Sequence, residues 1–184
     1  MTIELDISKL NLPTTNTLNK AIASSINKSV VTAKKELSIA VRAYYDIKKK
    51  DLDPKIKVNK ATMNDTQSII TVRSKPIGLI HFGAKSLKAF DKGQKRYFKT
   101  SAKVLKQSGR KVYKGAFIAK AKDSNSWQVF RRRTNKKLPL IKVSVITPTT
   151  MVEREGEKIF LETVDRRVKE IFFHELKYFT EKQK

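Results

Sequence analysis

The sequence predicts an α+β protein in which a mostly antiparallel β-sheet is flanked by a long N-terminal and a long C-terminal amphipathic helix. Three observations favour this class: an apolar stripe of helical period near the N-terminus, alternating apolar residues in the middle, and a second helical stripe at the end. The 184 residues suit one compact domain. We therefore expect residues 1–184 to form a single domain with a basic loop or hairpin insertion at about 84–115.

The first helix is indicated by apolar residues that recur every three or four positions between Leu18 and Tyr44. This spacing places them on one face of a helix of about eight turns, and that face packs on the rest of the protein. Pro13 and the threonines that follow it supply the stop and N-cap chemistry of a helix start. Asp46 and the lysines 48–50 are expected to close the helix, with one short helical turn before Pro54.

Two short strands are predicted next, because apolar and polar residues alternate at 56–58 and again at 70–72. Residues 63–65 are expected to form the turn between them. The apolar run 77–82 predicts a third strand. Three strands after a long helix indicate an antiparallel meander packed on that helix.

The following segment is rich in lysine and poor in apolar anchors, so we expect an exposed basic loop at 84–100. A hairpin that turns at Ser108 and Gly109 comes next. Two further strands are predicted on either side of the turn at 123–126. An apolar piece at 140–146 then lies between two prolines.

A second long helix is predicted from about residue 151 to residue 180, because large apolar residues recur at helical spacing from Phe160 to Phe179. Its remaining positions carry acids and bases in equal number, which suits a solvated outer face with local ion pairs. Gly156 is expected to weaken or break its first turns.

The chain carries a large and uneven positive charge. Lysine and arginine number 41 against 17 acids, a net charge of +24, and residues 85–142 alone hold 19 bases and 2 acids. Such a charge repels itself unless a polyanion or an acidic partner neutralises it. Two interpretations stay open: sequence-independent contact with nucleic-acid phosphates, helped by Tyr97, Phe98, Tyr113 and Trp127, and docking on an acidic protein surface. A merely solvated face explains this imbalance less well.

We expect the DNA-binding or partner-binding residues to lie in this segment, and we call this set the basic surface: Lys85, Lys88, Lys92, Lys95, Arg96, Lys99, Lys103, Lys106, Arg110, Lys111, Lys114, Arg131, Arg132, Arg133, Lys136 and Lys137.

The sequence contains no pattern of catalytic or metal-binding residues. His81 and His174 lie outside any local metal-ligand spacing, and Asp91 and Asp123, the acids of the basic segment, have turn-like surroundings. Cysteine is absent. We therefore expect a structural protein and not an enzyme, with no catalytic residue, no metal and no cofactor. No apolar run is long enough to span a bilayer, and the N-terminus does not read as a secretory signal, so we expect a cytoplasmic site of synthesis and no membrane contact.

Several short segments occur in a characteristic order between about residues 18 and 180: Ala43-Tyr44-Tyr45-Asp46-Ile47-Lys48, Lys57-Val58-Asn59-Lys60-Ala61-Thr62, Arg73-Ser74-Lys75-Pro76-Ile77, Leu79-Ile80-His81-Phe82-Gly83-Ala84, Lys111-Val112-Tyr113-Lys114-Gly115-Ala116-Phe117-Ile118-Ala119 and Leu138-Pro139-Leu140. A charged amphipathic helix completes the series. In this order and spacing the chain resembles the minor tail protein Z family of long-tailed bacteriophages and prophages.

The resemblance implies a tail-completion domain that acts at the head-proximal end of the tail and helps to join heads to tails and to pass DNA. The implied partners are the tail terminator ring, other tail and neck proteins and, without sequence preference, the genomic DNA. A ring-forming homo-oligomer in the virion, assembled in the host cytoplasm, is the expected state. The alternative is a free cytoplasmic protein that binds nucleic acid independently of sequence.

Overall fold

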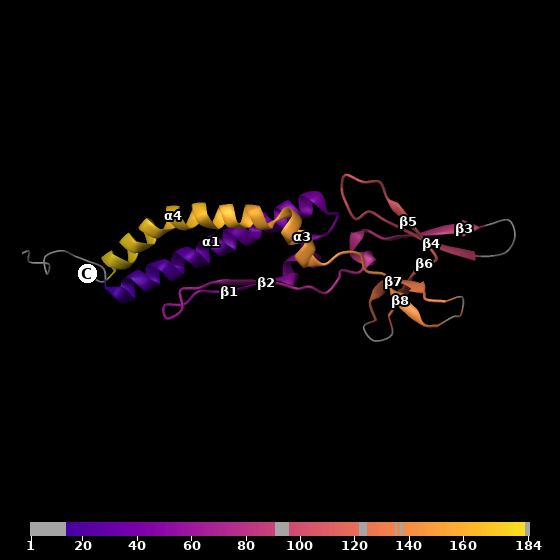
Figure 1. Ribbon diagram of the computed structural model, residues 1–184, viewed down its shortest axis with the longest axis horizontal. Helices are drawn as coiled ribbons and strands as arrows, with labels where there is room; N and C mark the ends of the chain where they lie inside the picture. Colours follow the sequence, from indigo (N-terminus) through magenta and orange to yellow (C-terminus); the bar gives the residue numbers. More distant parts are fainter. Residues whose placement is uncertain (1–13, 91–95, 122–124, 135, 137, 183–184) are drawn as a thin grey trace, which may run out of the picture. The chain divides into compact units, whose positions relative to one another are not determined.

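The structure is a computed structural model, and it describes residues 14–90, 96–121, 125–134, 136 and 138–182. Figure 1 shows the order of the elements. The helices and strands are α1 (Thr15–Tyr44), α2 (Lys49–Leu52), β1 (Ile56–Asn59), β2 (Ile69–Val72), β3 (Lys85–Phe90), β4 (Arg96–Ala102), β5 (Lys111–Lys114), β6 (Ala116–Lys120), β7 (Trp127–Arg132), β8 (Leu140–Lys142), α3 (Pro148–Glu155) and α4 (Glu157–Glu181), with the 3-10 helices η2 (Asp53–Lys55) and η3 (Leu79–Phe82). The predicted α+β class is confirmed.

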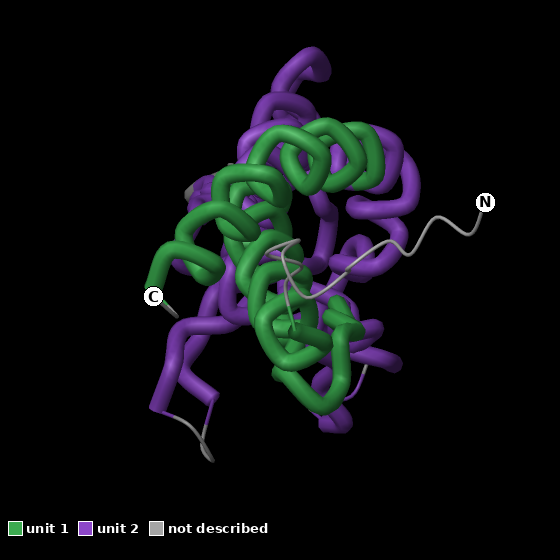
Figure 2. Tube along the Cα trace, turned by 90° about the vertical axis from the view of Figure 1, so that its left-hand side faces the viewer, with its two compact units in different colours: residues 1–33, 58–70, 161–184 green, residues 34–57, 71–160 purple. Residues whose placement is uncertain are grey.

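The chain divides into two compact units, which Figure 2 colours separately. Unit 1 comprises Met1–Ala33, Val58–Ile70 and Leu161–Lys184, and unit 2 comprises Lys34–Lys57 and Thr71–Phe160. The long helices α1 and α4 and the β1–β2 hairpin contribute residues to both units. The single-domain organisation expected for residues 1–184 stays a prediction.

Unit 1 begins with the predicted cap of α1, where the Thr17 N–H donates to Thr14 Oγ1 at 3.3 Å. The fully buried side chains of α1 in this unit are small, and they recur every four residues from Ala21 through Ser25 and Ser29 to Ala33. The larger apolar residues beside them, such as Ile22 and Ile26, are only half-buried. The helical stripe predicted from the sequence is therefore correct in period, but its centre is lined by alanine and serine.

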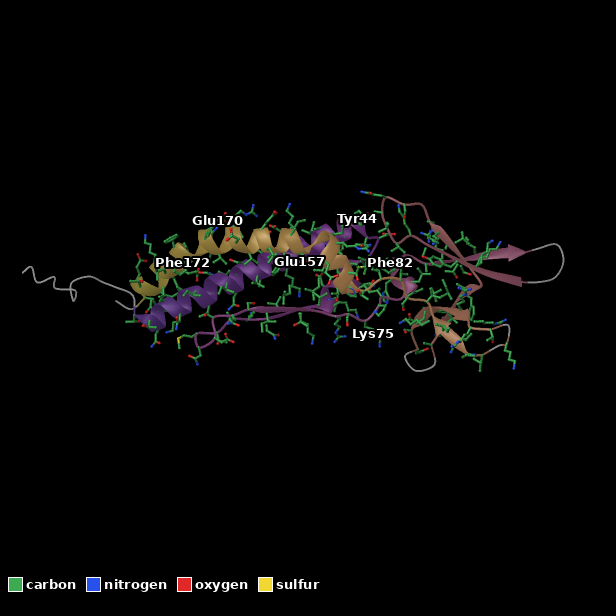
Figure 3. The ribbon with its side chains drawn as sticks, in the orientation of Figure 1. Tyr44, Lys75, Phe82, Glu157, Glu170 and Phe172 are labelled. Atoms are coloured by element: carbon green, nitrogen blue, oxygen red, sulfur yellow. The ribbon has the colours of Figure 1, made fainter. Side chains whose placement is uncertain are left out.

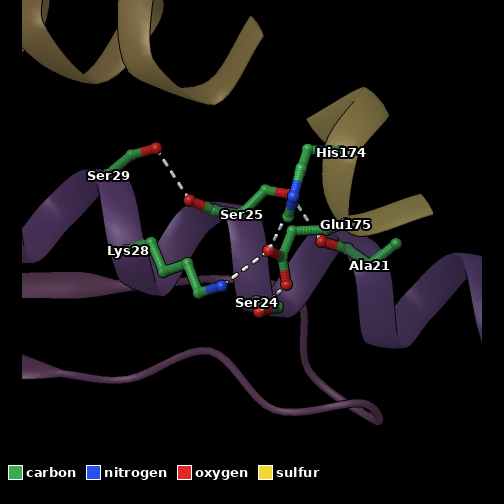
Figure 4. A network of polar contacts seen from close by, with 7 residues as sticks. All are labelled: Ala21, Ser24, Ser25, Lys28, Ser29, His174 and Glu175. Atoms are coloured by element: carbon green, nitrogen blue, oxygen red, sulfur yellow. Dashed lines mark hydrogen bonds and ion pairs between the residues drawn. The ribbon is translucent and has the colours of Figure 1, made fainter. Parts of the chain in front are cut away.

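The serines of this stripe are satisfied within the helix. Ser25 Oγ donates to the Ala21 carbonyl at 2.6 Å, and Ser29 Oγ donates to the Ser25 carbonyl at 2.7 Å. Both bonds are drawn in Figure 4. A buried hydroxyl without a partner would cost about 1–3 kcal/mol, so these bonds allow polar residues on a buried helix face.

Glu175 of α4 makes the main polar contact with α1 in unit 1 (Figure 4). Its side chain is 4% exposed, Ser24 Oγ donates to its Oε2 at 2.6 Å, and Lys28 Nζ lies 2.6 Å from its Oε1. Burial acts to raise the pKa of Glu175, but the hydrogen bonds from Lys28 and Ser24 outweigh it and hold the pKa below its ordinary value. The ionised carboxylate is therefore part of the folded state.

Glu175→Gln is expected to lower the free energy of unfolding at neutral pH by about 1–3 kcal/mol, because two charge-assisted hydrogen bonds weaken. Since the folded-state pKa lies below the unfolded value, this contribution is complete above the unfolded pKa and is lost as pH falls through the folded one. Urea unfolding followed by far-UV circular dichroism should show the difference from wild type disappear in acid.

The matched control is Glu170→Gln, which removes an exposed carboxylate paired with Arg167 at 2.8 Å. Figure 3 labels Glu170 on α4. An exposed pair contributes little, so a change below about 0.5 kcal/mol is expected. Equal losses in Glu175→Gln and Glu170→Gln, or a difference that persists in acid, would contradict the assignment.

The β1–β2 hairpin has the predicted turn. Thr62 N–H donates to the Asp65 carbonyl at 2.7 Å, and Asp65 N–H donates to Thr62 Oγ1 at 3.0 Å. These two bonds close the loop around residues 63–65. The two strands form a sheet of their own, and the six later strands form two further sheets with the orders β3-β4-β5 and β6-β7-β8.

In unit 2 the helical part packs around a glycine between α3 and α4. Thr147 caps α3 by accepting from the Thr150 N–H at 3.1 Å, and the helix stops at Gly156, as predicted. A Cβ built on Gly156 would lie 3.0 Å from Leu37 Cγ and 3.3 Å from Val41 Cγ2, both in buried side chains of α1. A side chain at position 156 would therefore press on both of these buried residues.

Gly156→Val is therefore expected to destabilise the protein by about 1–3 kcal/mol through overpacking. Thermal unfolding measures the change. Gly109→Val is the control, because a Cβ at Gly109 meets nothing within 4 Å, and it should cost less than about 0.5 kcal/mol. If Gly156→Val were as stable as wild type, Gly156 would not be closely packed against Leu37 and Val41.

The two three-stranded sheets of unit 2 are antiparallel throughout. They share a core cluster of four fully buried residues, Leu79, Ala102, Ala116 and Val129. Thr100, also buried, donates from its hydroxyl to the Ala116 carbonyl at 2.9 Å. The small side chains of β4 and β6 let the two sheets approach closely at this cluster.

Two sequence predictions are wrong in this unit. Residues 77–82, expected as a strand, contain the 3-10 helix η3, which ends at Gly83 with φ 59. Within the described residues 77–82, the strand-like pairing is limited to a single bridge between Gly78 and Ser144. Residues 84–100, expected as a loop, contain β3 and most of β4, whose pairing with each other and with β5 supplies the hydrogen bonds that the sequence pattern does not reveal.

Candidate functional site

The basic surface predicted from the sequence lies on four strands of unit 2, β3, β4, β5 and β7, and on the connections between strands. Thirteen of its sixteen residues fall within the described part of the chain: Lys85 and Lys88 in β3, Arg96 and Lys99 in β4, Lys103, Lys106 and Arg110 between β4 and β5, Lys111 and Lys114 in β5, Arg131 and Arg132 in β7, and Arg133 and Lys136 after it. Lys92, Lys95 and Lys137 lie outside the described residues.

One face of the β3-β4-β5 sheet gathers three of these lysines. Lys99 is the direct cross-strand partner of Lys114, and Lys85 lies on the same face because side chains alternate along a strand. Leu87 and Val112, also on this face, are exposed. The opposite face carries the buried Thr100 and Ala102. The lysines therefore occupy the solvent side of the sheet, among exposed apolar residues.

Among the described residues, no ion pair involves the three lysines of this face. Between Asp65 and Glu153 the sequence contains only Asp91 and Asp123, and neither belongs to the described residues. The ion pairs between described residues use acids of the helices and of α2 and η2. Like charges directly opposite each other on neighbouring strands, as at Lys99 and Lys114, are destabilising. The arrangement favours an anionic partner that relieves this repulsion.

Arg110 differs from the rest of the set. Its guanidinium donates to the Gly83 carbonyl at 2.5 Å and to the Ser101 carbonyl at 3.0 Å, with a further bond to Ser101 Oγ at 3.3 Å. These bonds tie Gly83, two residues before β3, to Ser101 near the end of β4. Three of its donors are thereby occupied within the protein, so its role includes holding the sheet together.

The three consecutive arginines do not form one cluster. Arg131 pairs with Ala116 and Ile141, and Arg132 pairs with Leu140. Because neighbouring residues of a strand point to opposite faces, Arg131 and Arg132 lie on different sides of the β6-β7-β8 sheet. A single flat ligand surface therefore contacts one of them and not both.

Aromatic residues accompany the charge on this sheet. Trp127 is 57% exposed, and Lys120 Nζ lies 5.7 Å from its ring centroid on the paired strand. Phe117 and Phe130 are cross-strand partners with ring centroids 6.4 Å apart. An exposed indole beside a cation is a site where a base or another ring can stack. Lys120 lies outside the basic surface predicted from the sequence.

Tyr113, which the sequence placed among the aromatic helpers, contributes to packing. It is half-buried against the core cluster, and burial raises the pKa of its phenol. The side chain therefore faces the protein interior, and it stays protonated and neutral.

The two histidines have structural surroundings. His81 lies in η3, and its Nδ1 is 3.0 Å from Asp51 Oδ1. His174 is exposed on α4, with Nδ1 3.4 Å from Glu175 Oε1. Within the described residues, no group of three histidine, aspartate or glutamate side chains could hold a metal ion. Among the helices that the structure describes, none has the length and apolarity needed to cross a membrane.

The family described as prophage minor tail protein Z (GPZ) matches residues 2–183, which is nearly the whole chain. No curated protein and no solved structure gives a significant match.

Proposed function

The chain belongs to the prophage minor tail protein Z family, and from this premise we propose that it completes the tail at its head-proximal end, where it helps to join the head and to pass DNA. Membership makes the protein a minor tail protein, a component of the virion that associates with other tail proteins. The head-proximal position, the terminator ring as partner and a ring of identical copies are parts of the proposal.

The observation that supports the proposal is the pair of acid-free sheets in unit 2. Lys85, Lys99 and Lys114 project from one face with no described acid beside them. A protein at the end of a DNA-filled tube meets either phosphates or the surface of a neighbouring ring. Lysines on such a face can contact DNA phosphates. Because phosphate contacts do not involve the edges of the bases, they give binding without sequence preference.

The role is proposed as structural and non-enzymatic, with no cofactor. Positive charge on a small sheet lowers the energy of DNA in the lumen through electrostatics alone. If the ligand is an acidic ring surface, the same charges set the orientation and rate of docking. In both cases the basic surface supplies attraction, and the helices of the protein are available for other tail contacts.

The test is electron microscopy of lysates from a phage or prophage that lacks this gene. We expect tails of wrong length, unjoined heads and tails, or complete particles that fail to deliver DNA. Complementation with the wild-type gene should restore infectious particles. Complementation with the triple variant Arg131→Ala, Arg132→Ala and Arg133→Ala should restore fewer. Normal, infectious particles from the deletion strain would exclude the proposed role.

The alternative is a nucleic-acid-binding protein that acts outside the particle. The exposed Trp127 beside Lys120 is the observation in its favour, because that pair suits stacking of an unpaired base. Purified virions separate the two: the tail role requires the protein in the particle after density-gradient purification, and the alternative predicts its absence.

A further inference from the structure

A second concentration of positive charge lies away from the basic surface. A pocket of about 340 Å³ in unit 2 is lined by five basic side chains together with His81: Lys50, Lys55, Arg73, Lys75 and Lys142. They come from α2, η2, the segment after β2, and β8. Asp51 is the one acid among the lining residues. With His81 neutral, five cations and one carboxylate give the lining a formal charge of +4.

Backbone hydrogen bonds bring these distant parts of the chain together. Arg73 N–H donates to the Lys55 carbonyl at 2.9 Å, so these two residues lie side by side beyond the β1–β2 hairpin. A second pairing involves β8: Leu79 N–H donates to the Val143 carbonyl at 2.9 Å, and Gly78 bridges to Ser144. This pairing sets Lys142 beside Gly78, near Lys75, which Figure 3 labels.

Gly78 makes room for Lys142. A Cβ built on Gly78 would lie 2.9 Å from Lys142 Cε and 3.1 Å from Gln128 Oε1, so the end of the lysine side chain would have to shift to admit it. The lysine stem therefore passes directly over the glycine, and its ammonium reaches the pocket from β8. A larger residue at position 78 displaces this ammonium without removing its charge.

His81 and Asp51 are matched to each other at the pocket wall. Asp51 Oδ1 lies 3.0 Å from His81 Nδ1, so the one carboxylate of the lining is engaged by the imidazole. This contact fixes the ring and leaves the second nitrogen, Nε2, for another partner. Within the described part of the chain, no ion pair neutralises any of the five cations.

We propose that this pocket binds a phosphoryl group. A phosphate presents several anionic oxygens, which take the forked donors of Arg73 and the point charges of the lysines at the same time. The volume of the pocket suits a small anion with its waters and not a large organic ligand. The phosphoryl group comes from a free phosphate compound or from a nucleic-acid backbone. The inference does not depend on the tail role, because it concerns other residues and the isolated protein.

Isothermal titration calorimetry with pyrophosphate tests the site. The wild-type protein should bind one equivalent saturably. The double variant Arg73→Gln and Lys142→Gln should bind at least about tenfold more weakly, the loss expected for one charge-assisted hydrogen bond. The control Lys35→Gln and Lys57→Gln removes the same charge from exposed positions outside the pocket and should leave binding unchanged. Circular dichroism verifies that each variant is folded.

Gly78→Ala provides a second variant in which the net charge is constant. It should weaken pyrophosphate binding because the added methyl moves Lys142. If a short DNA duplex displaces pyrophosphate, the phosphoryl group that the pocket binds belongs to a nucleic-acid backbone. If the duplex does not displace pyrophosphate, the ligand is a free phosphate compound. No saturable binding, equal loss in the lysine control, or binding of polyglutamate in place of pyrophosphate would overturn the proposal.

Discussion

Replacing Lys85, Lys99 and Lys114 together by glutamine is expected to lower the affinity for duplex DNA by about 10- to 100-fold at low salt. The three lysines share one exposed face of the β3-β4-β5 sheet, with Lys99 opposite Lys114 and no described acid beside them. Each phosphate contact releases about 0.9 counterion equivalents, so the slope of log K against log salt should become less steep by about 2.7.

Fluorescence anisotropy of a labelled duplex over a range of salt concentrations measures both quantities. The control replaces Lys20, Lys35 and Lys57 by glutamine, which removes the same charge from exposed positions outside the sheet. If affinity depends only on net charge, the two triple variants lose the same amount. That result would show that this face of the sheet is not a specific DNA contact, and that DNA is attracted only by the net charge of the protein.

The largest effect on stability is expected for Leu79→Ala. Leu79 is fully buried in η3, where it joins β4, β6 and β7 through Ala102, Ala116 and Val129. The other three members of the cluster are small, so they cannot fill the space that the leucine leaves. The free energy of unfolding should fall by about 3–5 kcal/mol, the upper part of the range for leucine truncation.

Urea unfolding monitored by the fluorescence of Trp127, which lies in β7, reports directly on this unit. Leu87→Ala is the control, since Leu87 is 40% exposed on the lysine face of the neighbouring strand, and it should cost less than about 1 kcal/mol. Similar losses in both variants would mean that η3 does not anchor the two sheets.

The helices were predictable because their signal is local. Thr14 caps α1, the stripe to Tyr44 continues for its whole length, and Gly156 divides the C-terminal helix where a glycine was expected to weaken it. What the period did not reveal was the centre of the buried face in unit 1. Ala21, Ser25 and their neighbours are buried because the close contact admits only small residues, and hydropathy ranks them below the isoleucines beside them.

The strands β3 and β4 were missed because their pattern is not hydrophobic. Lys85, Leu87 and Lys99 occupy the solvent face, and Thr100 and Ala102 are buried on the other. A strand whose outward face carries lysines shows almost no alternation of large apolar and polar residues. The pairing of β4 with β5 joins residues that are distant in the sequence, so a local pattern does not reveal it. At residues 77–82 the opposite error occurred, since a buried apolar run fits a short helix and a strand equally well.

The candidate sites were predictable only where charge is dense in the sequence. Counting bases identified the segment 85–142 and placed Arg131 and Arg132 together in the basic surface. The pairing of β7 puts these two arginines on opposite faces of their sheet. The pocket of Lys55, Arg73 and Lys142 escaped the count because its members are far apart in the chain and only backbone pairing assembles them.

Gold labelling tests most directly where the protein lies in the particle. An epitope fused to the C-terminus and detected in purified virions by electron microscopy reveals where the protein lies. The account predicts gold at the junction of head and tail, on every tail and at one end only. Gold along the tube or at the tip distal to the head would contradict the head-proximal assignment, and unlabelled virions would contradict the virion role itself.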